Sequence, residues 1–164
     1  MQKRWIGFLA LICVLQWLSG YYKLFGETSP QWCLIFITAL AIHHGSLAGE
    51  LFGFFLGLFV DVLSVQLFGG HCLIFTWVGY GVGRFKRQID VSRTLSQMVL
   101  LFVISLIYGM LFALIYLISF HSFPLAMART FVIQAFYNTL LAPLVFYWIE
   151  KFGLNSESSG LHYP

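Results

Sequence analysis

The chain has 164 residues, of which 60% are hydrophobic and 9% are charged, and its formal net charge is +3. A soluble domain carries about 25% charged residues, so this surface cannot face water all round. A water-soluble enzyme, a nucleic-acid-binding module and a disordered chain are therefore excluded. The composition predicts an all-α integral membrane protein with a single transmembrane bundle over residues 1–152.

Six apolar stretches divide the chain, and each is a predicted span. Their approximate limits are 4–24, 31–43, 46–66, 70–83, 95–119 and 126–149. The second and fourth are shorter than the roughly 20 residues that a span needs, so we expect them to tilt or to begin in the interface. A five-span alternative treats 31–66 as a re-entrant hairpin that bends at residues 43–46. The tail 153–164, rich in Ser and Gly, is predicted to be disordered and cytoplasmic.

The distribution of basic residues predicts the orientation of the bundle. With six spans and the N-terminus inside, the inner side receives Lys3, Arg4, Arg84, Lys86, Arg87, Arg93 and Lys151. The outer side receives only Lys23 and Arg129, so the pattern favours an N-in, C-in bundle. The basic loop 84–94 is interpreted either as this topology signal with attraction to anionic lipid, or as a docking surface for a cytoplasmic partner.

The third stretch contains a repeat of small residues at steps of four. The repeat comprises Gly49, Gly53, Gly57 and Asp61. Four-residue steps stay on one helical face, and a glycine face lets another helix approach closely in a membrane. The repeat therefore predicts a packing groove, with Ser46, Glu50 and Ser64 on the same side.

Two acids in this stretch have two interpretations. Glu50 and Asp61 are eleven residues apart, which is about 16 Å along a helix. They could lie on a proton or cation path, because an acid inside a span is costly and usually has a role. They could instead be structural, with Asp61 bonded to backbone or a basic partner. We favour the structural interpretation because acids this far apart do not form one ion site.

The sixth stretch offers a polar partner for the third. Its four-residue repeat comprises Thr130, Gln134, Asn138 and Ala142. Pro143 then removes a helical hydrogen bond near the inner end. Arg129 stands at the outer end at a depth similar to that of Asp61, so it is a candidate ion-pair partner, although it could equally extend to the headgroups. We predict that Asp61 points into the bundle with Arg129 or Asn138 within polar reach.

No catalytic or cofactor arrangement is readable in the chain. The three cysteines, Cys13, Cys33 and Cys72, lie in apolar runs without CxxC spacing, so neither a zinc site nor a disulfide is indicated. His71 has no evident partner, and the Gly-rich run 79–83 is interpreted as helix packing because no strand precedes it. We predict a protein that is not an enzyme and that has no cofactor or metal site.

The order of these motifs resembles the rod shape-determining protein MreD family. The resemblance rests on Ser29-Pro30-Gln31-Trp32 before a span, on the segment from Gly53 to Ser64, on Leu67-Phe68-Gly69, and on Asn138 to Pro143. It covers roughly residues 29–83 and 126–151. The chain departs from the family pattern at Ser29, where Arg is common, and at Gln31, where Asp or Asn is common.

The resemblance implies a non-enzymatic scaffold of the bacterial elongation machinery in the cytoplasmic membrane. Its expected partner is MreC, a single-span coiled-coil protein, with indirect links to the actin-like MreB, a SEDS glycosyltransferase and a class B penicillin-binding protein. The implied architecture is the six-helix fold of the substrate-binding subunits of energy-coupling-factor transporters. A small-solute-binding subunit of such a transporter is therefore the alternative function.

Overall fold

The computed structural model describes residues 2–22, 28–64, 67–88, 93–121 and 125–151, and within these ranges its regular structure is entirely helical. The helices are α1 (Gln2–Tyr22), α2 (Trp32–His44), α3 (Ser46–Leu63), α4 (Gly70–Phe85), α5 (Thr94–Phe120) and α6 (Leu125–Lys151). The prediction of an all-α chain with six helices is confirmed. The predicted disordered tail 153–164 lies outside the described residues.

Three of these helices are long and apolar enough to cross a membrane. They are Ser46–Leu63, Thr94–Phe120 and Met127–Lys151. By contrast, α2 has 13 residues and α4 has 16. At about 1.5 Å per residue, α2 extends over roughly 20 Å, less than the hydrocarbon thickness of about 30 Å. A helix of this length depends on neighbouring helices to satisfy the polar groups at its ends.

The short helix α2 lies at the centre of the bundle. Its residues 33–41 are all buried, and α2 contacts each of the other five helices. Leu34, Ile35 and Phe36 are completely inaccessible, although they point in three different directions around the helix. A helix that is apolar all round must be enclosed on every side, and α2 forms the core of this fold.

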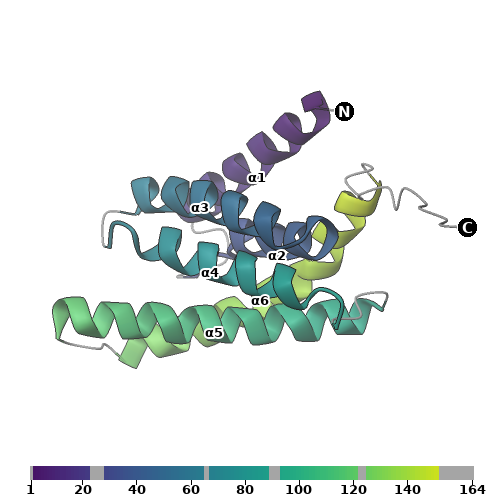
Figure 1. Ribbon diagram of the computed structural model, residues 1–164. Helices are drawn as coiled ribbons and strands as arrows, with labels where there is room; N and C mark the ends of the chain where they lie inside the picture. The colour runs from purple at the N-terminus through teal and green to yellow at the C-terminus, as the bar shows by residue number, and fades with distance from the viewer. Residues whose placement is uncertain (1, 23–27, 65–66, 89–92, 122–124, 152–164) are drawn as a thin grey trace, which may run out of the picture.

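The remaining helices surround α2 mainly as two antiparallel pairs, α3 with α4 and α5 with α6, while α1 lies at an angle to them (Figure 1). The chain reverses between α2 and α3 at Gly45, whose φ is 91°, and α4 follows Gly69, whose φ is 94°. Both angles lie in the left-handed region that glycine adopts without strain. The chain thus bends at Gly45, within residues 43–46 where the five-span alternative placed the bend of its hairpin.

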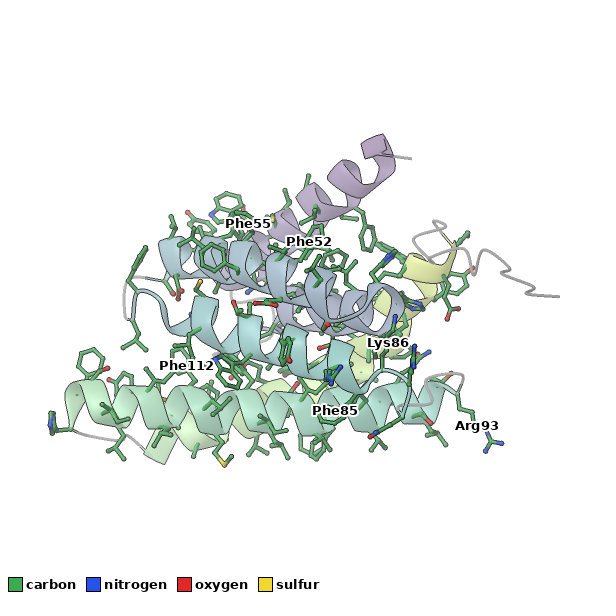
Figure 2. All side chains as sticks on the ribbon, in the orientation of Figure 1. Phe52, Phe55, Phe85, Lys86, Arg93 and Phe112 are labelled. Carbon is green, nitrogen blue, oxygen red and sulfur yellow. The ribbon has the colours of Figure 1, made fainter. Side chains whose placement is uncertain are left out.

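The bundle has two ends, which we call the Asp61 end and the Lys86 end. At the Asp61 end, α1, α3 and α5 end and α2, α4 and α6 begin; in Figure 1 it is on the left. At the Lys86 end, Lys86 and Arg93 lie beside the start of α5 (Figure 2). Pro143 lies inside α6, which changes direction toward its C-terminal end in Figure 1, as expected where proline removes a helical hydrogen bond.

Candidate functional site

The glycine repeat of α3 is the contact surface toward α4. A Cβ atom added at Gly49 would meet the carbonyl oxygen of Gly79, and one added at Gly53 would meet that of Phe75. The two helices therefore touch through their backbones rather than through side chains. Such contact provides the close van der Waals packing that holds helices together where no hydrophobic effect acts between them.

The same contact continues toward both ends of the two helices. A Cβ at Gly57 would meet the Cα atom of Cys72, and one at Gly83 would meet the Cα atom of Ser46. Gly81 differs, because no described atom lies within 4 Å of a Cβ placed there. Among the three glycines near the C-terminal end of α4, Gly79 and Gly83 face α3, whereas Gly81 faces open space.

The opposite side of α3 faces away from the bundle. Phe55 is 63% exposed and lies on the outer side of the helix (Figure 2). Glu50 is also exposed, so the prediction that it lies with the glycines is wrong. Glu50 follows Gly49 by about 100° around the helix, and this rotation takes its side chain out of the contact with α4.

Asp61, the last member of the four-residue repeat, caps the start of α4. Its Oδ1 atom accepts the His71 backbone N–H at 3.0 Å, and its Oδ2 atom accepts the Cys72 backbone N–H at 2.9 Å. The His71 Nδ1 atom lies 2.8 Å from Oδ1. A carboxylate at a helix N-terminus satisfies N–H groups that have no partner within the helix and favours the helix dipole. Because the preceding residue is Gly69, α4 has no capping side chain of its own.

Asp61 is bonded to backbone, as the structural interpretation allowed, but neither side chain predicted within its reach is its partner. Arg129 is exposed at the start of α6, and the amide of Asn138 bonds instead to Gln31, which directly precedes α2, and to Ser105 of α5. The side-chain partner of Asp61 is His71, which the sequence analysis left without a partner. The start of α4 offers Asp61 two backbone N–H donors at fixed positions. Asp61 bonds to these donors rather than to Arg129, although Arg129 was predicted at a similar depth in the membrane.

Aromatic rings enclose the Asp61–His71 pair. The His71 ring centroid lies 4.9 Å from that of Phe112, 5.9 Å from that of Phe75 and 6.1 Å from that of Tyr108. Asp61 is 1% exposed. Solvent is thus excluded from Asp61, so the described protein groups supply the stabilisation of the carboxylate.

A second polar cluster holds the start of α2. The Gln31 backbone N–H donates to Asn138 Oδ1 at 2.8 Å, and Asn138 Nδ2 donates to Ser105 Oγ at 2.9 Å. The Gln31 side chain donates through Nε2 to the Tyr108 hydroxyl at 2.9 Å. These bonds join α2, α5 and α6 within the bundle. Asn138 is completely buried, and its amide has both a donor and an acceptor in use.

Two further glutamines support the same helix start. Gln134 Nε2 donates to the Ser29 carbonyl at 2.9 Å, and Gln16 Oε1 accepts the Cys33 backbone N–H at 3.3 Å. Gln134 and Asn138 are one helical turn apart on α6, so both can reach the segment that leads into α2. The predicted polar seam of α6 thus faces the start of α2 rather than Asp61.

We expect Asn138→Ala to lower the free energy of unfolding by about 1 to 3 kcal/mol, because it leaves the Gln31 N–H buried without its acceptor. The midpoint of thermal unfolding in detergent measures the effect. Thr139→Ala is the matched control, since the Thr139 hydroxyl bonds to the Ala135 carbonyl within α6. Equal midpoints for the two variants would contradict a capping role for Asn138.

An apolar groove separates α4 from α5. It has a volume of about 360 Å³ and is lined by Trp77, Val78, Gly81, Val82, Phe85, Leu100, Val103, Ile104, Ile107 and Leu111. Figure 2 shows Phe85 at this gap, near the Lys86 end. Trp77 and Phe85 are 68% and 55% exposed. Its open space lies beside Gly81, on the side of α4 that does not face α3.

Sequence reasoning missed most of the polar partners. Ser105 and Tyr108 lie on α5 and Gln31 precedes α2, so their proximity is set by the tertiary fold. Gln31 belongs to the Ser29–Trp32 motif, but that motif does not indicate its partners. Gln31 carried a weak signal, because a polar residue in front of an apolar stretch is a common helix start. His71 carried a similar signal, since it follows Gly69 and Gly70 at the beginning of the fourth stretch.

The comparisons with known proteins give one match. A family model described as rod shape-determining protein MreD matches residues 4–154. No curated protein and no solved structure matches the chain, so the predicted likeness to energy-coupling-factor subunits stays a prediction. The match includes residues of all six helices. It also includes the two capped helix starts, that is, Asp61 at the start of α4 and the polar cluster around Gln31 and Asn138 at the start of α2. The chain therefore belongs to the MreD family of rod shape-determining proteins.

Proposed function

We propose that this protein is a non-enzymatic scaffold subunit of the rod elongation complex in the bacterial inner membrane. It binds the single membrane-spanning helix of MreC in the groove between α4 and α5. Through MreC it couples MreB to the SEDS glycosyltransferase and the class B penicillin-binding protein that build the lateral wall. Membership of the MreD family supports a role in rod shape, and the groove is the observation that supports the binding site.

The chemistry of the groove favours a transmembrane helix. Its walls are apolar, and Gly81 offers an open backbone surface among them. Small residues at such a position let a second helix approach closely, as Gly79 does for α3. A lone lipid chain would fill the same volume but would gain nothing from a glycine at its centre.

The orientation is proposed to be N-in, C-in. Exposed Arg84, Arg87 and Arg93 lie at the Lys86 end, and by the positive-inside rule they support a cytoplasmic location for this end. These side chains adjoin the cytoplasmic opening of the groove. They would therefore meet the segment of MreC that precedes its span, and anionic lipid headgroups around it.

Filling the groove tests this proposal. Gly81→Phe adds a ring where the described structure leaves open space, so we expect the protein to fold normally but to lose most of the MreC that co-purifies in mild detergent. Gly7→Phe is the control, because Gly7 also has no described atom within 4 Å of its Cβ position and lies on α1. Normal MreC recovery with Gly81→Phe would exclude this groove as the binding site.

The same purification separates the two candidate functions. Recovery of a single-span coiled-coil protein supports the scaffold. Recovery of two ATPase subunits with a large transmembrane coupling subunit would instead identify a solute-binding transport subunit and overturn the proposal.

A further inference from the structure

A second cavity lies at the Asp61 end. Some polar atoms of its lining residues form the hydrogen bonds described above, and others have no partner among the described residues. It has a volume of about 380 Å³ and is lined by Gln16, Trp17, Gly20, Tyr21, Gln31, Val60, Leu63, Ser64 and His71. These residues come from the end of α1, the start of α2, the end of α3 and the start of α4. The cavity is separate from the α4–α5 groove, with which it shares no lining residue.

Two lining residues of this cavity each carry a buried oxygen atom that has no hydrogen-bond partner among the described residues. These atoms are Gln31 Oε1 and Ser64 Oγ. Gln31 is 7% exposed, and its other side-chain polar atom already donates to Tyr108. A buried polar atom without a partner is unfavourable by about 1 to 3 kcal/mol, and such atoms in native proteins usually meet a ligand, an ion or water.

The remaining polar groups define which ligand fits. A carboxylate only accepts hydrogen bonds, so the proton between Asp61 and His71 lies on Nδ1, and Nε2 of the neutral ring is an acceptor. Gln16 uses Oε1 for Cys33 and keeps its NH₂ group as a donor. The cavity thus offers mainly acceptors, and none of its described lining side chains is charged apart from the titratable His71.

The wall of the cavity supplies aromatic faces. Trp17 and Tyr21 lie one turn apart on α1 and their rings are stacked, with centroids 5.7 Å apart and planes 21° apart. Both rings are at least half exposed. Aromatic surface beside a few fixed polar groups is typical of small-molecule sites. C–H faces of a ligand can pack on the rings while its O–H groups reach the acceptors behind them.

We infer that this cavity binds a neutral ligand rich in hydroxyl groups, that is, a sugar or polyol group, either free or as the head of a lipid. The O–H groups of such a ligand donate to Gln31 Oε1, Ser64 Oγ and His71 Nε2. A phosphate or carboxylate would place its lone pairs against these acceptors, with no facing Lys or Arg among the described lining residues. This inference does not depend on MreC binding, which uses the other cavity.

The test uses the full-length protein in phosphatidylcholine nanodiscs, because the headgroup of a maltoside detergent would itself occupy the site. Maltose is titrated in solution, and in a second arm monoglucosyl diacylglycerol is included in the nanodisc. The readout is the tryptophan emission, to which Trp17 contributes. A saturable change with maltose indicates a free sugar, and a change only with the glycolipid indicates a lipid headgroup; both support the inference.

Paired variants make the result specific to the cavity. Gly20→Leu and Gly7→Leu are both on α1 where no described atom lies within 4 Å of the new Cβ, so both should fold, but only Gly20→Leu fills the cavity. We expect it to abolish the change and Ser64→Ala to weaken binding about fivefold, as loss of one hydrogen bond predicts. The inference is overturned if neither probe gives a saturable change, if Gly20→Leu binds like Gly7→Leu, or if inorganic phosphate binds more tightly than maltose.

Discussion

Asp61→Leu is expected to lower the free energy of unfolding by about 3 to 5 kcal/mol, because it leaves three buried donors without an acceptor and each such loss costs about 1 to 3 kcal/mol. The leucine cannot accept the N–H groups of His71 and Cys72, and it leaves the His71 ring without its acceptor. All three donors then face an apolar interior. Thermal unfolding in detergent measures the loss, and amide exchange at positions 71 and 72 should increase most.

Asp61→Asn tests the role of the second oxygen atom. Its single carbonyl oxygen can keep the bonds at His71, but its NH₂ group faces the donor of Cys72, so we expect an intermediate loss of stability. Glu50→Leu is the matched control, because Glu50 is an exposed acid on the same helix. If Asp61→Leu were as well tolerated as Glu50→Leu, the cap would not contribute to stability. If Asp61→Asn kept full stability but lost rod-shape function, the charge itself would matter.

Gly79→Ala is expected to destabilise the bundle although it adds only one methyl group. The new Cβ would collide with the backbone of Gly49, which cannot rotate away as a side chain could, so α3 and α4 must separate along their length. Overpacking of this kind costs about 1 to 3 kcal/mol. The change in the midpoint of thermal unfolding measures it.

Gly81→Ala, two residues further along α4, is expected not to destabilise the bundle. The methyl group enters open space, and alanine favours the helix over glycine by up to about 1 kcal/mol. We expect equal or higher stability. A similar loss for Gly79→Ala and Gly81→Ala would show that the glycines act through helix propensity rather than through contact with α3.

Part of this architecture follows from the sequence. The number of helices follows from the alternation of apolar stretches with charged and turn residues, and the spacing of Gly49, Gly53 and Gly57 predicts one small face because four-residue steps hold residues on one side of a helix. The identity of the helix that packs on this face is not contained in the spacing. Several helices present small residues, and the choice of α4 depends on how all six pack.

The hydrogen-bond partners of the buried polar residues were harder to predict than their burial. Asp61 and Asn138 are both buried, as the cost of placing polar groups in a membrane requires. The sequence analysis allowed a backbone or a basic partner for Asp61 and named Arg129, whereas backbone N–H groups at the start of α4 stabilise the carboxylate together with His71. Helix starts that lie inside a bundle are donors that composition alone does not reveal.

The two capped helix starts also differ in when their partners become available. Asp61 and His71 are ten positions apart in the chain, whereas Gln31 and Asn138 are separated by 107. During synthesis, α3 and α4 can therefore complete their shared cap as soon as both have left the ribosome. At the start of the central helix α2, Gln16 of α1 can accept the Cys33 N–H early, but the Gln31 N–H must wait for Asn138 of α6, the last helix described. Assembly of the core is thus tied to completion of the chain, and a truncated product would carry an exposed, incompletely capped α2 that quality-control proteases could recognise.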